Sequence, residues 1–428
     1  MMRRVVVTGI GVVTPLGREL IEFWRNLVGG TSAVRQISLF DASSFPARIA
    51  AEVPASVFDC GKPFGDRRYF KVMSRAAKFA VAASDDAVRD AGLSAGEVAP
   101  ERLGVVVGSG LAEDDFERQC RIAIRCAGSD GEIDLMRYAD ECSARQDPLA
   151  YIRKLPNMPA CHVAIRHSAR GPNTSITTAC AAGTHAIGHA ARIIERGDAD
   201  VVLAGGADAR IHPDGIMRFA LLGTLSARND APTEASRPFD ADRDGFVMGE
   251  GAAMFVLESW EHAFRRGARP YAEVVGFGST ADACGLVAAP EDVRGAVECL
   301  RRALADARLG PSEIDYIAAH GTSTPTNDRL ETLAIKKVFG RWASAVAVSS
   351  IKSMIGHLIA AAGAVQFATC LLVLRTGMVP PTINHERSDP ACDLDYVPNH
   401  ARTLRARAVM SNSFGFGGQN ASLVAVGV

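Results

Sequence analysis

A pattern of strands and helices occurs twice along this chain of 428 residues and limits the folds that it can adopt. In each half, two apolar, glycine-punctuated stretches are followed by a third that leads into a helix. The matched stretches are residues 5–13 with 272–278, 103–110 with 314–321, and 174–179 with 345–350. Apolar runs that alternate with helical periodicity are typical of strands buried on both faces of largely parallel sheets. The sequence therefore predicts an α/β fold with two similar halves.

The predicted halves span residues 1–260 and 268–428 and pack against each other. A chain of this length exceeds the usual ceiling for one hydrophobic core. Open α/β sheets bind ligands at the carboxyl ends of their strands, so the two halves are expected to bring those ends to a common centre. Residues 113–156 are polar, irregular and rich in Arg and Asp, and we interpret them as an insertion that covers this centre.

Charge and cysteine usage argue against several classes of protein. The net charge of −1 disfavours a nucleic-acid-binding protein, which would normally carry a clear basic excess. The ten cysteines stand singly, without a C-x-x-C pair, which indicates reduced thiols in a cytoplasmic protein and no zinc site. The N-terminal apolar run is too short for a signal peptide. The apolar stretch 359–374 is interpreted as a buried helix, so no membrane span is expected.

Cys180 is the predicted nucleophile. It lies in Thr-Thr-Ala-Cys-Ala-Ala-Gly, residues 177–183, where a strand is expected to turn sharply into a helix. The small neighbours let the backbone turn and let a substrate approach closely. A cysteine at a helix N-terminus lies at the positive end of the helix dipole. We therefore expect Cys180 to favour the thiolate over the thiol.

Two histidines follow predicted strands of the second half. His320 opens the loop His-Gly-Thr-Ser-Thr-Pro, and His357 ends the block Lys-Ser-Met-Ile-Gly-His. A lone histidine is more often structural, but two at equivalent turns of a duplicated fold are expected to face Cys180. Neutral imidazoles can both donate a hydrogen bond to one thioester oxygen and stabilise the enolate formed as CO2 leaves.

Other groups near the histidines are expected to support them. Lys352 would hold the histidine tautomers or support the site electrostatically. Asp328 and Glu331 are three residues apart on one face of a short helix, which suits hydrogen bonds to Lys352 or to a loop. Residues 412–418, Asn-Ser-Phe-Gly-Phe-Gly-Gly, form a glycine loop whose N–H groups can bind an oxyanion and whose aromatic rings can gate a cavity.

In order along the chain, these blocks resemble the beta-ketoacyl-acyl-carrier-protein synthases of the thiolase superfamily, across essentially the whole sequence. The closest likenesses are the elongating synthase II of bacterial fatty-acid synthesis and the ketosynthase subunit of type II polyketide synthases. The resemblance implies a thiolase-like, layered αβαβα sandwich. It also implies a decarboxylative Claisen condensation between an acyl group on the cysteine and a malonyl group carried on the phosphopantetheine of acyl carrier protein. No resident cofactor or metal is expected.

The resemblance further implies roles for individual residues. Cys180 would carry the acyl group, and His320 and His357 would lie at the malonyl carbonyl. The backbone N–H groups of Cys180 and Phe416 would form an oxyanion hole, with Phe416 as the gate. Further implied contacts are Thr322 and Thr324 to the pantetheine arm, Leu111 and Phe219 to the acyl chain, and Arg67, Arg68 and Lys71 to acyl carrier protein. The expected subunit partner is a second copy or a homologous chain-length factor that lacks the cysteine.

Three stretches depart from the family pattern. Gln366 stands where elongating synthases usually carry Glu, so the negative charge that normally balances the positive charge of Lys352 is missing. Cys-Gly-Leu-Val at 284–287 replaces Tyr-His-Met-Thr near the malonyl entrance, and a glycine is lost at 112–113. These differences concern acyl preference and carrier docking. The long insertion and residues 388–398 favour the polyketide enzymes, and the fatty-acid pathway stays open.

Three other functions are weaker alternatives. A biosynthetic thiolase acting on coenzyme A esters would use a second cysteine near the C-terminus as base, whereas this chain offers His357. A dinucleotide-binding oxidoreductase would need a third glycine after Gly9-Ile10-Gly11 and an acidic residue about 20 positions on, and the chain has neither. A chain-length factor that binds without condensing is disfavoured by the intact Cys180.

Overall fold

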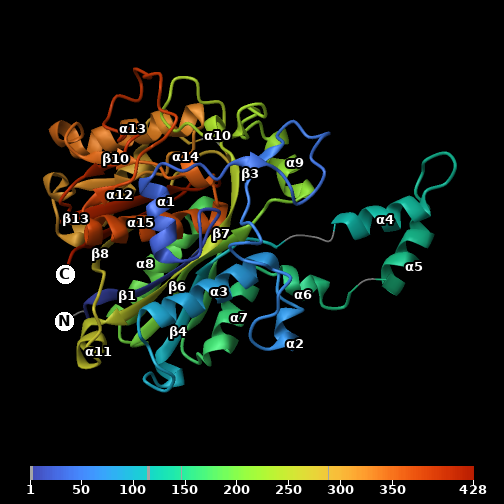
Figure 1. Ribbon diagram of the computed structural model, residues 1–428, viewed down its shortest axis with the longest axis horizontal. Coiled ribbons are helices and arrows are strands. Elements are labelled where there is room, and N and C mark those ends of the chain that lie inside the picture. The colour runs from blue at the N-terminus through green and yellow to red at the C-terminus, as the bar shows by residue number, and fades with distance from the viewer. Residues whose placement is uncertain (1–2, 113–115, 146, 288) are drawn as a thin grey trace.

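The computed structural model describes residues 3–112, 116–145, 147–287 and 289–428. Glu113, at which the predicted insertion begins and one family glycine is lost, lies outside the described residues. The described chain forms a body of stacked layers from which a helical hairpin projects (Figure 1).

The first half contributes five main strands in the order β5-β4-β6-β7-β1. β4 pairs in parallel with β5 and β6, whereas β7 pairs antiparallel with β6 and β1. The short strands β2 and β3 extend the sheet beside β7. The bounds are β1 (Val5–Val13), β2 (Arg35–Gln36), β3 (Ile49–Ala51), β4 (Leu103–Gly108), β5 (Asn173–Ile176), β6 (Val201–Ala209) and β7 (Met248–Ser259).

The second half repeats this order as β10-β9-β13-β14-β8. Again two pairs are parallel, β9 with β10 and with β13, and two are antiparallel, β14 with β13 and with β8. The halves join where β1 pairs antiparallel with β8. The bounds are β8 (Ala272–Ala281), β9 (Tyr316–Ala318), β10 (Ala347–Ser349), β13 (Ala408–Phe414) and β14 (Gln419–Val426); β11 (Met378–Val379) and β12 (Arg402–Thr403) pair separately.

The internal duplication predicted from the sequence is confirmed. The three matched pairs of apolar stretches correspond to β1 with β8, β4 with β9 and β5 with β10, and each pair occupies the same place in its strand order. The prediction of largely parallel sheets needs a correction, because one central strand in each half, β7 or β14, runs against its neighbours. These two reversed strands were not recognised because they are buried along nearly their whole length and show no alternation.

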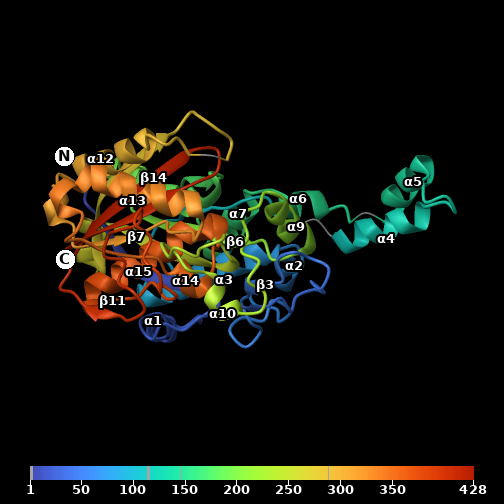
Figure 2. The ribbon, with the colours of Figure 1, turned by 90° about the horizontal axis from the view of Figure 1, so that it is seen from above.

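Helices form three layers around the strands, which gives the predicted αβαβα sandwich (Figures 1 and 2). α3 and α7 cover the outer face of the first half, and α12 and α13 cover that of the second. α8 and α15 lie between the halves. The bounds are α3 (Arg75–Asp90), α7 (Met158–His167), α8 (Ala182–Glu195), α12 (Arg294–Ala307), α13 (Pro325–Phe339), α15 (Ala362–Thr376), α1 (Leu20–Val28), α9 (Pro213–Leu221), α10 (Pro232–Ala235), α11 (Trp260–Arg265) and α14 (Lys352–Ile355).

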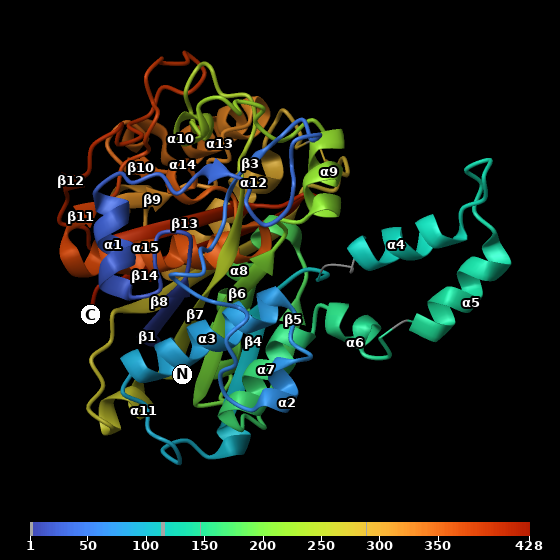
Figure 3. The same cartoon turned by 45° about the vertical axis from the view of Figure 1, so that its right-hand side comes forward.

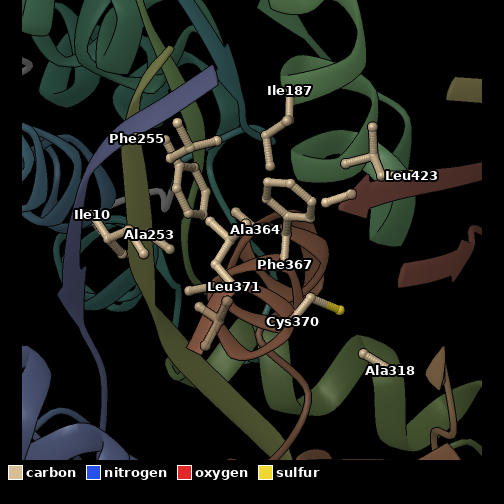
Figure 4. Close-up of a cluster of buried hydrophobic side chains, with 14 of the residues drawn as sticks. Ile10, Ile187, Ala253, Phe255, Ala318, Ala364, Phe367, Cys370, Leu371 and Leu423 are labelled. Atoms are coloured by element: carbon tan, nitrogen blue, oxygen red, sulfur yellow. The ribbon is translucent and has the colours of Figure 1, made fainter. Parts of the chain in front are cut away.

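The central core surrounds α15, whose side chains are buried on all sides. Phe367 and Leu371 of this helix pack among residues of both halves, including Phe255 and Leu423 (Figure 4). The apolar stretch Ile359–Thr376 has the length and composition of a membrane span, yet 83% of it is buried inside the protein. Its burial between two sheets accounts for its hydropathy, as expected from the sequence.

Gly9 and Gly11 lie within β1 and not in a turn after it. A Cβ at Gly11 would lie 2.0 Å from the carbonyl oxygen of Ala83 in α3, so these glycines allow a helix to approach the strand closely. The dinucleotide-binding alternative fails here, because its glycines must turn the chain toward a helix N-terminus.

The described part of the insertion does not cover the centre of the molecule. α4 (Phe116–Cys126) and α5 (Leu135–Arg145) form a hairpin that projects away from the body in all views, and α6 (Ala150–Lys154) returns to it (Figure 3). Ile124, Leu135 and Met136 on this hairpin are each more than 70% exposed. The prediction of a covering insertion is therefore wrong for α4 and α5: Ile122 and Cys126 are buried, but the other three side chains stay exposed.

Replacing Gly108 with alanine should destabilise the fold. A Cβ at this position would lie 2.4 Å from the backbone carbon of Ala182, at the start of α8, so strand and helix would have to separate. We expect a loss of about 1–3 kcal/mol in the free energy of unfolding, measured by denaturant titration. Gly427→Ala is the control, because nothing lies within 4 Å of a Cβ there. Equal stability of the two variants would contradict this close approach.

Candidate active site

Cys180 lies in a tight turn between β5 and α8. Residues 179–181 form a short 3-10 turn, and Ala179 has a φ of 46°, a left-handed conformation that costs energy for a residue with a side chain. The turn places Cys180 in the interior, with only 5% of the residue exposed. The predicted sharp elbow is therefore present.

The expectation of a resting thiolate at Cys180 is wrong. Burial raises the pKa of the thiol to about 11 and outweighs the charge of Lys352 and hydrogen bonds from the backbone N–H groups of Phe416 and Cys180, which lower it. Helix α8 begins two residues later, at Ala182. Desolvation therefore opposes the thiolate that the sequence suggested, and the folded site favours the thiol at neutral pH.

A second elbow in the other half presents His357. It lies between α14 and the 3-10 turn 359–361, and Ile359 has a φ of 45°, nearly that of Ala179. The backbone N–H of Ile359 donates a hydrogen bond to Nδ1 of His357 at 3.2 Å. Because Nδ1 is an acceptor, the neutral ring carries its proton on Nε2 and can donate from there.

His320 follows β9 at the adjacent strand end and completes a compact cluster. One polar atom from each of Cys180, His320 and His357 lies within 4.8 Å of the others. The two imidazole rings are 5.5 Å apart between centroids and nearly perpendicular. Three turns that are far apart in the sequence therefore converge as predicted.

Both imidazoles are held in the neutral form. Burial lowers the pKa of His320 and of His357 well below the usual value, and the positive charge of Lys352 lowers both further. Phe246 lies 5.1 Å from the His357 ring, and Phe414 lies 5.8 Å from the His320 ring, so apolar walls maintain the desolvation. Neutral rings are the state expected for N–H donors to a thioester oxygen.

Glu331 and Asp328 stabilise the loops around the histidines. Glu331 accepts hydrogen bonds from the backbone N–H groups of His320 and Gly321 at 2.8 and 2.7 Å. Asp328 accepts from the backbone N–H of Phe239 at 2.8 Å. The predicted loop contact is therefore present for both, although their helix, α13, has 15 residues and is not short.

Lys352 is fully buried and is held by neutral groups. Its ammonium donates to the carbonyl oxygen of His320 at 2.5 Å and to Oε1 of Gln366 at 2.6 Å. Burial lowers the pKa of this lysine, and the charge of Glu331 partly offsets that effect. Lys352 therefore supports the His320 backbone directly, and its charge lies close to the reaction centre.

The cluster opens into a cavity of about 480 Å³. Cys180 is the one cysteine among the described residues that line it, so no second cysteine is placed to act as a thiolase base there. Other predicted site residues on its wall are Phe416, Thr322, Thr324 and Phe219.

Family models match the chain as the beta-ketoacyl synthase N-terminal domain over residues 2–263 and the C-terminal domain over residues 271–386. The chain belongs to the beta-ketoacyl synthase family. A 3-oxoacyl-(acyl-carrier-protein) synthase 2 from Coxiella burnetii is 44% identical, covering 99% of this chain and 98% of that protein. The ketoacyl synthase alpha subunit of the tetracenomycin polyketide synthase from Streptomyces glaucescens is 41% identical, covering 99% and 97%.

Solved ketosynthases share the fold of this synthase. The ketosynthase of a type II polyketide synthase, solved with its acyl-carrier protein and bound to the hexaketide, superposes with a TM-score of 0.87 at 34% identity, covering both chains fully. The ishigamide ketosynthase/chain length factor gives the same TM-score at 35% identity. The chain therefore has the thiolase-like fold and is an acyl-transferring ketosynthase.

Not all predicted contact residues of the synthase lie at the cavity. Leu111 is 60% exposed and lines a different cavity, with Phe40, Met73 and His212, so the structure does not bring it beside Cys180. Arg67, Arg68 and Lys71 are exposed at α2 (Arg67–Phe70) and its end, and Arg68 pairs with Asp66. Their binding to a carrier stays a prediction.

Two residues that support the second elbow were missed in the sequence. Phe246 packs against His357, and Oδ2 of Asp208 accepts a hydrogen bond from the backbone N–H of Ala360 at 3.1 Å, in the second elbow. Asp208 follows the glycine pair of β6 at the strand end, a position that could have drawn attention to it. No local pattern marks Phe246.

Proposed function

We propose that this synthase joins an acyl group on Cys180 to a malonyl group with loss of CO2. The Cys180 sulfur attacks an acyl thioester, its proton passes to the leaving pantetheine thiol, and an acyl-enzyme results. Malonyl thioester then loses CO2, and the resulting enolate carbon attacks the acyl-enzyme. A carbon–carbon bond forms, the carbon–sulfur bond to Cys180 breaks, and the released thiolate takes up one proton from solvent to restore the thiol.

The observation that carries this proposal is the cluster of one thiol and two neutral imidazoles within 4.8 Å in one cavity. His320 and His357 would donate to the malonyl thioester oxygen and stabilise the enolate. The N–H groups of Cys180 and Phe416 would bind the oxyanion of the acyl-enzyme, with Phe416 as the gate. Thr322 and Thr324 would bond the pantetheine arm and Phe219 would contact the acyl chain. No resident cofactor or metal enters these steps.

We further propose acyl carrier protein as the substrate carrier. Relatives at 40–44% identity are named as acyl-carrier-protein synthases, and one solved neighbour holds its carrier. Arg67, Arg68 and Lys71 form an exposed basic group suited to an acidic carrier surface. All ten cysteines are unpaired, which agrees with a reducing, cytoplasmic compartment.

We also propose that a second ketosynthase-type subunit packs against the exposed hairpin α4–α5. Its apolar side chains Ile124, Leu135 and Met136 need a surface to cover them. A second copy or a chain-length factor would supply it, and a solved neighbour is described as a ketosynthase/chain length factor. Both fatty-acid elongation and type II polyketide or polyene assembly remain within this proposal.

Isotope tracing tests the proposed reaction. The purified synthase, an acyl-carrier thioester and malonyl carrier labelled in the free carboxyl should give labelled CO2 and an unlabelled β-ketoacyl carrier by mass spectrometry. The thiolase alternative gives a different result, namely condensation of two acyl-coenzyme A molecules without CO2. Product formation from acyl-coenzyme A alone would contradict the proposal.

A further inference from the structure

Gln366 on α15 is a buried amide whose polar atoms are both engaged at the reaction centre. Its Nε2 donates to the carbonyl oxygens of Ala319 and Asn412 at 2.9 and 3.0 Å. Its Oε1 accepts from the ammonium of Lys352 at 2.6 Å. One side chain therefore links Lys352 to the ends of β9 and β13.

An amide at position 366 matches these partners on both sides. An ammonium offers only donors and a carbonyl offers only acceptors, so the linking group must accept on one side and donate on the other. A carboxylate would place an oxygen against the oxygens of Ala319 and Asn412. An apolar side chain would leave Lys352 and both carbonyls without a buried partner, which is costly.

The charge of Lys352 therefore meets no carboxylate in direct contact among the described residues. Among the acidic groups, Glu331 has the largest effect on the pKa of Lys352. Both of its carboxylate oxygens, however, accept hydrogen bonds from backbone N–H groups. Asp328 is held by the N–H of Phe239 and lies 3.7 Å from Arg243. The titratable groups that face Lys352 are Glu331, Asp328, Cys180, His320 and His357, and Asp208 also faces Cys180.

We propose that Gln366 is a positioning residue that anchors the Lys352 ammonium on the carbonyl of His320 without neutralising it, so that the lysine charge acts on Cys180 and both histidines. This proposal rests on the proposed function and assigns electrostatic control of the same site. Burial is the largest influence on the pKa of Cys180, His320 and His357, and the Lys352 charge comes next and lowers the pKa of all three, as the proposal requires. A carboxylate at 366 would cancel part of that field.

The test measures alkylation of Cys180 by iodoacetamide, which needs no thioester and is independent of whether the protein condenses anything. In Gln366→Glu the added charge should raise the pKa of the Cys180 thiol by about one unit. The rate constant should then fall about tenfold at each pH below about 8, where Lys352, whose pKa burial lowers to about 8, still carries its charge. Gln366→Met, of similar size, loses the hydrogen bonds to Lys352 but adds no charge, so it should move the rate–pH curve clearly less than Gln366→Glu does.

Coincident curves for the parent and Gln366→Glu would overturn the proposal. Equal displacement by Glu and Met would also overturn it, because it would show a structural role without an effect of charge. If Gln366→Glu does not fold, the Met variant is compared with the parent in the decarboxylation of malonyl carrier. Its kcat should fall about tenfold at unchanged KM, because Lys352 loses an anchor. A kcat equal to the parent's would contradict the anchoring role.

Discussion

Cys180→Ala should abolish formation of the acyl-enzyme while the protein stays folded. Intact-mass measurement after incubation with an acyl-carrier thioester should show one acyl addition on the parent and none on the variant. The reason is chemical: without the sulfur no thiol among the described residues faces the cavity, although the backbone N–H of residue 180 and both imidazoles remain in place.

Cys284→Ala is the matched control for that result. Cys284 is an exposed thiol in the stretch that departs from the family pattern, so a solvent-accessible cysteine that acylates nonspecifically would be found there. The control variant should load like the parent. An acyl addition that survives in Cys180→Ala and vanishes in Cys284→Ala would contradict the assignment of the nucleophile.

His320→Ala should keep acyl loading but lose decarboxylation of malonyl carrier by a factor of about 10²–10³, the usual effect of removing one oxyanion donor. The substitution removes only the ring. The backbone N–H of residue 320 still donates to Glu331, and its carbonyl still accepts from Lys352, so the loop keeps its supports. Release of CO2 and acyl addition should be measured on the same preparation.

His400→Ala serves as the control, because His400 is exposed and does not line the cavity. It should leave both steps unchanged. Equal loss of loading and decarboxylation in His320→Ala would contradict the division of labour between the sulfur and the imidazoles.

The duplicated architecture was readable from the sequence because buried strands and glycine-punctuated turns recur in the same order in both halves. The convergence of Cys180, His320 and His357 followed from that repeat, since equivalent strand ends meet at one centre. The reversed strands β7 and β14 were not readable, because buried strands of either direction are continuously apolar. The outward direction of α4–α5 also escaped prediction, because exposed apolar residues such as Ile124, Leu135 and Met136 look in the sequence like residues that pack on the body.

The pKa values at the site depend on burial, which cannot be read from the residues next to each group in the sequence. The turn around Cys180 suggested a thiolate, but the pKa is decided by the apolar walls that surround the sulfur after folding. Leu111 is a second example: the sequence does not show that this side chain is 60% exposed and lies away from Cys180. Gln366 was visible as a departure from the family, whereas its amide contacts needed the positions of Ala319 and Asn412.

The central claim is that one sulfur and two imidazole donors surround a single thioester. A crystal structure of the synthase with a non-hydrolysable malonyl–pantetheine amide tests it most directly. The claim predicts the amide carbonyl oxygen about 3 Å from a ring nitrogen of both His320 and His357, with the malonyl carbon toward Cys180. A carbonyl oxygen bound away from both rings, with the imidazoles facing no part of the ligand, would contradict it.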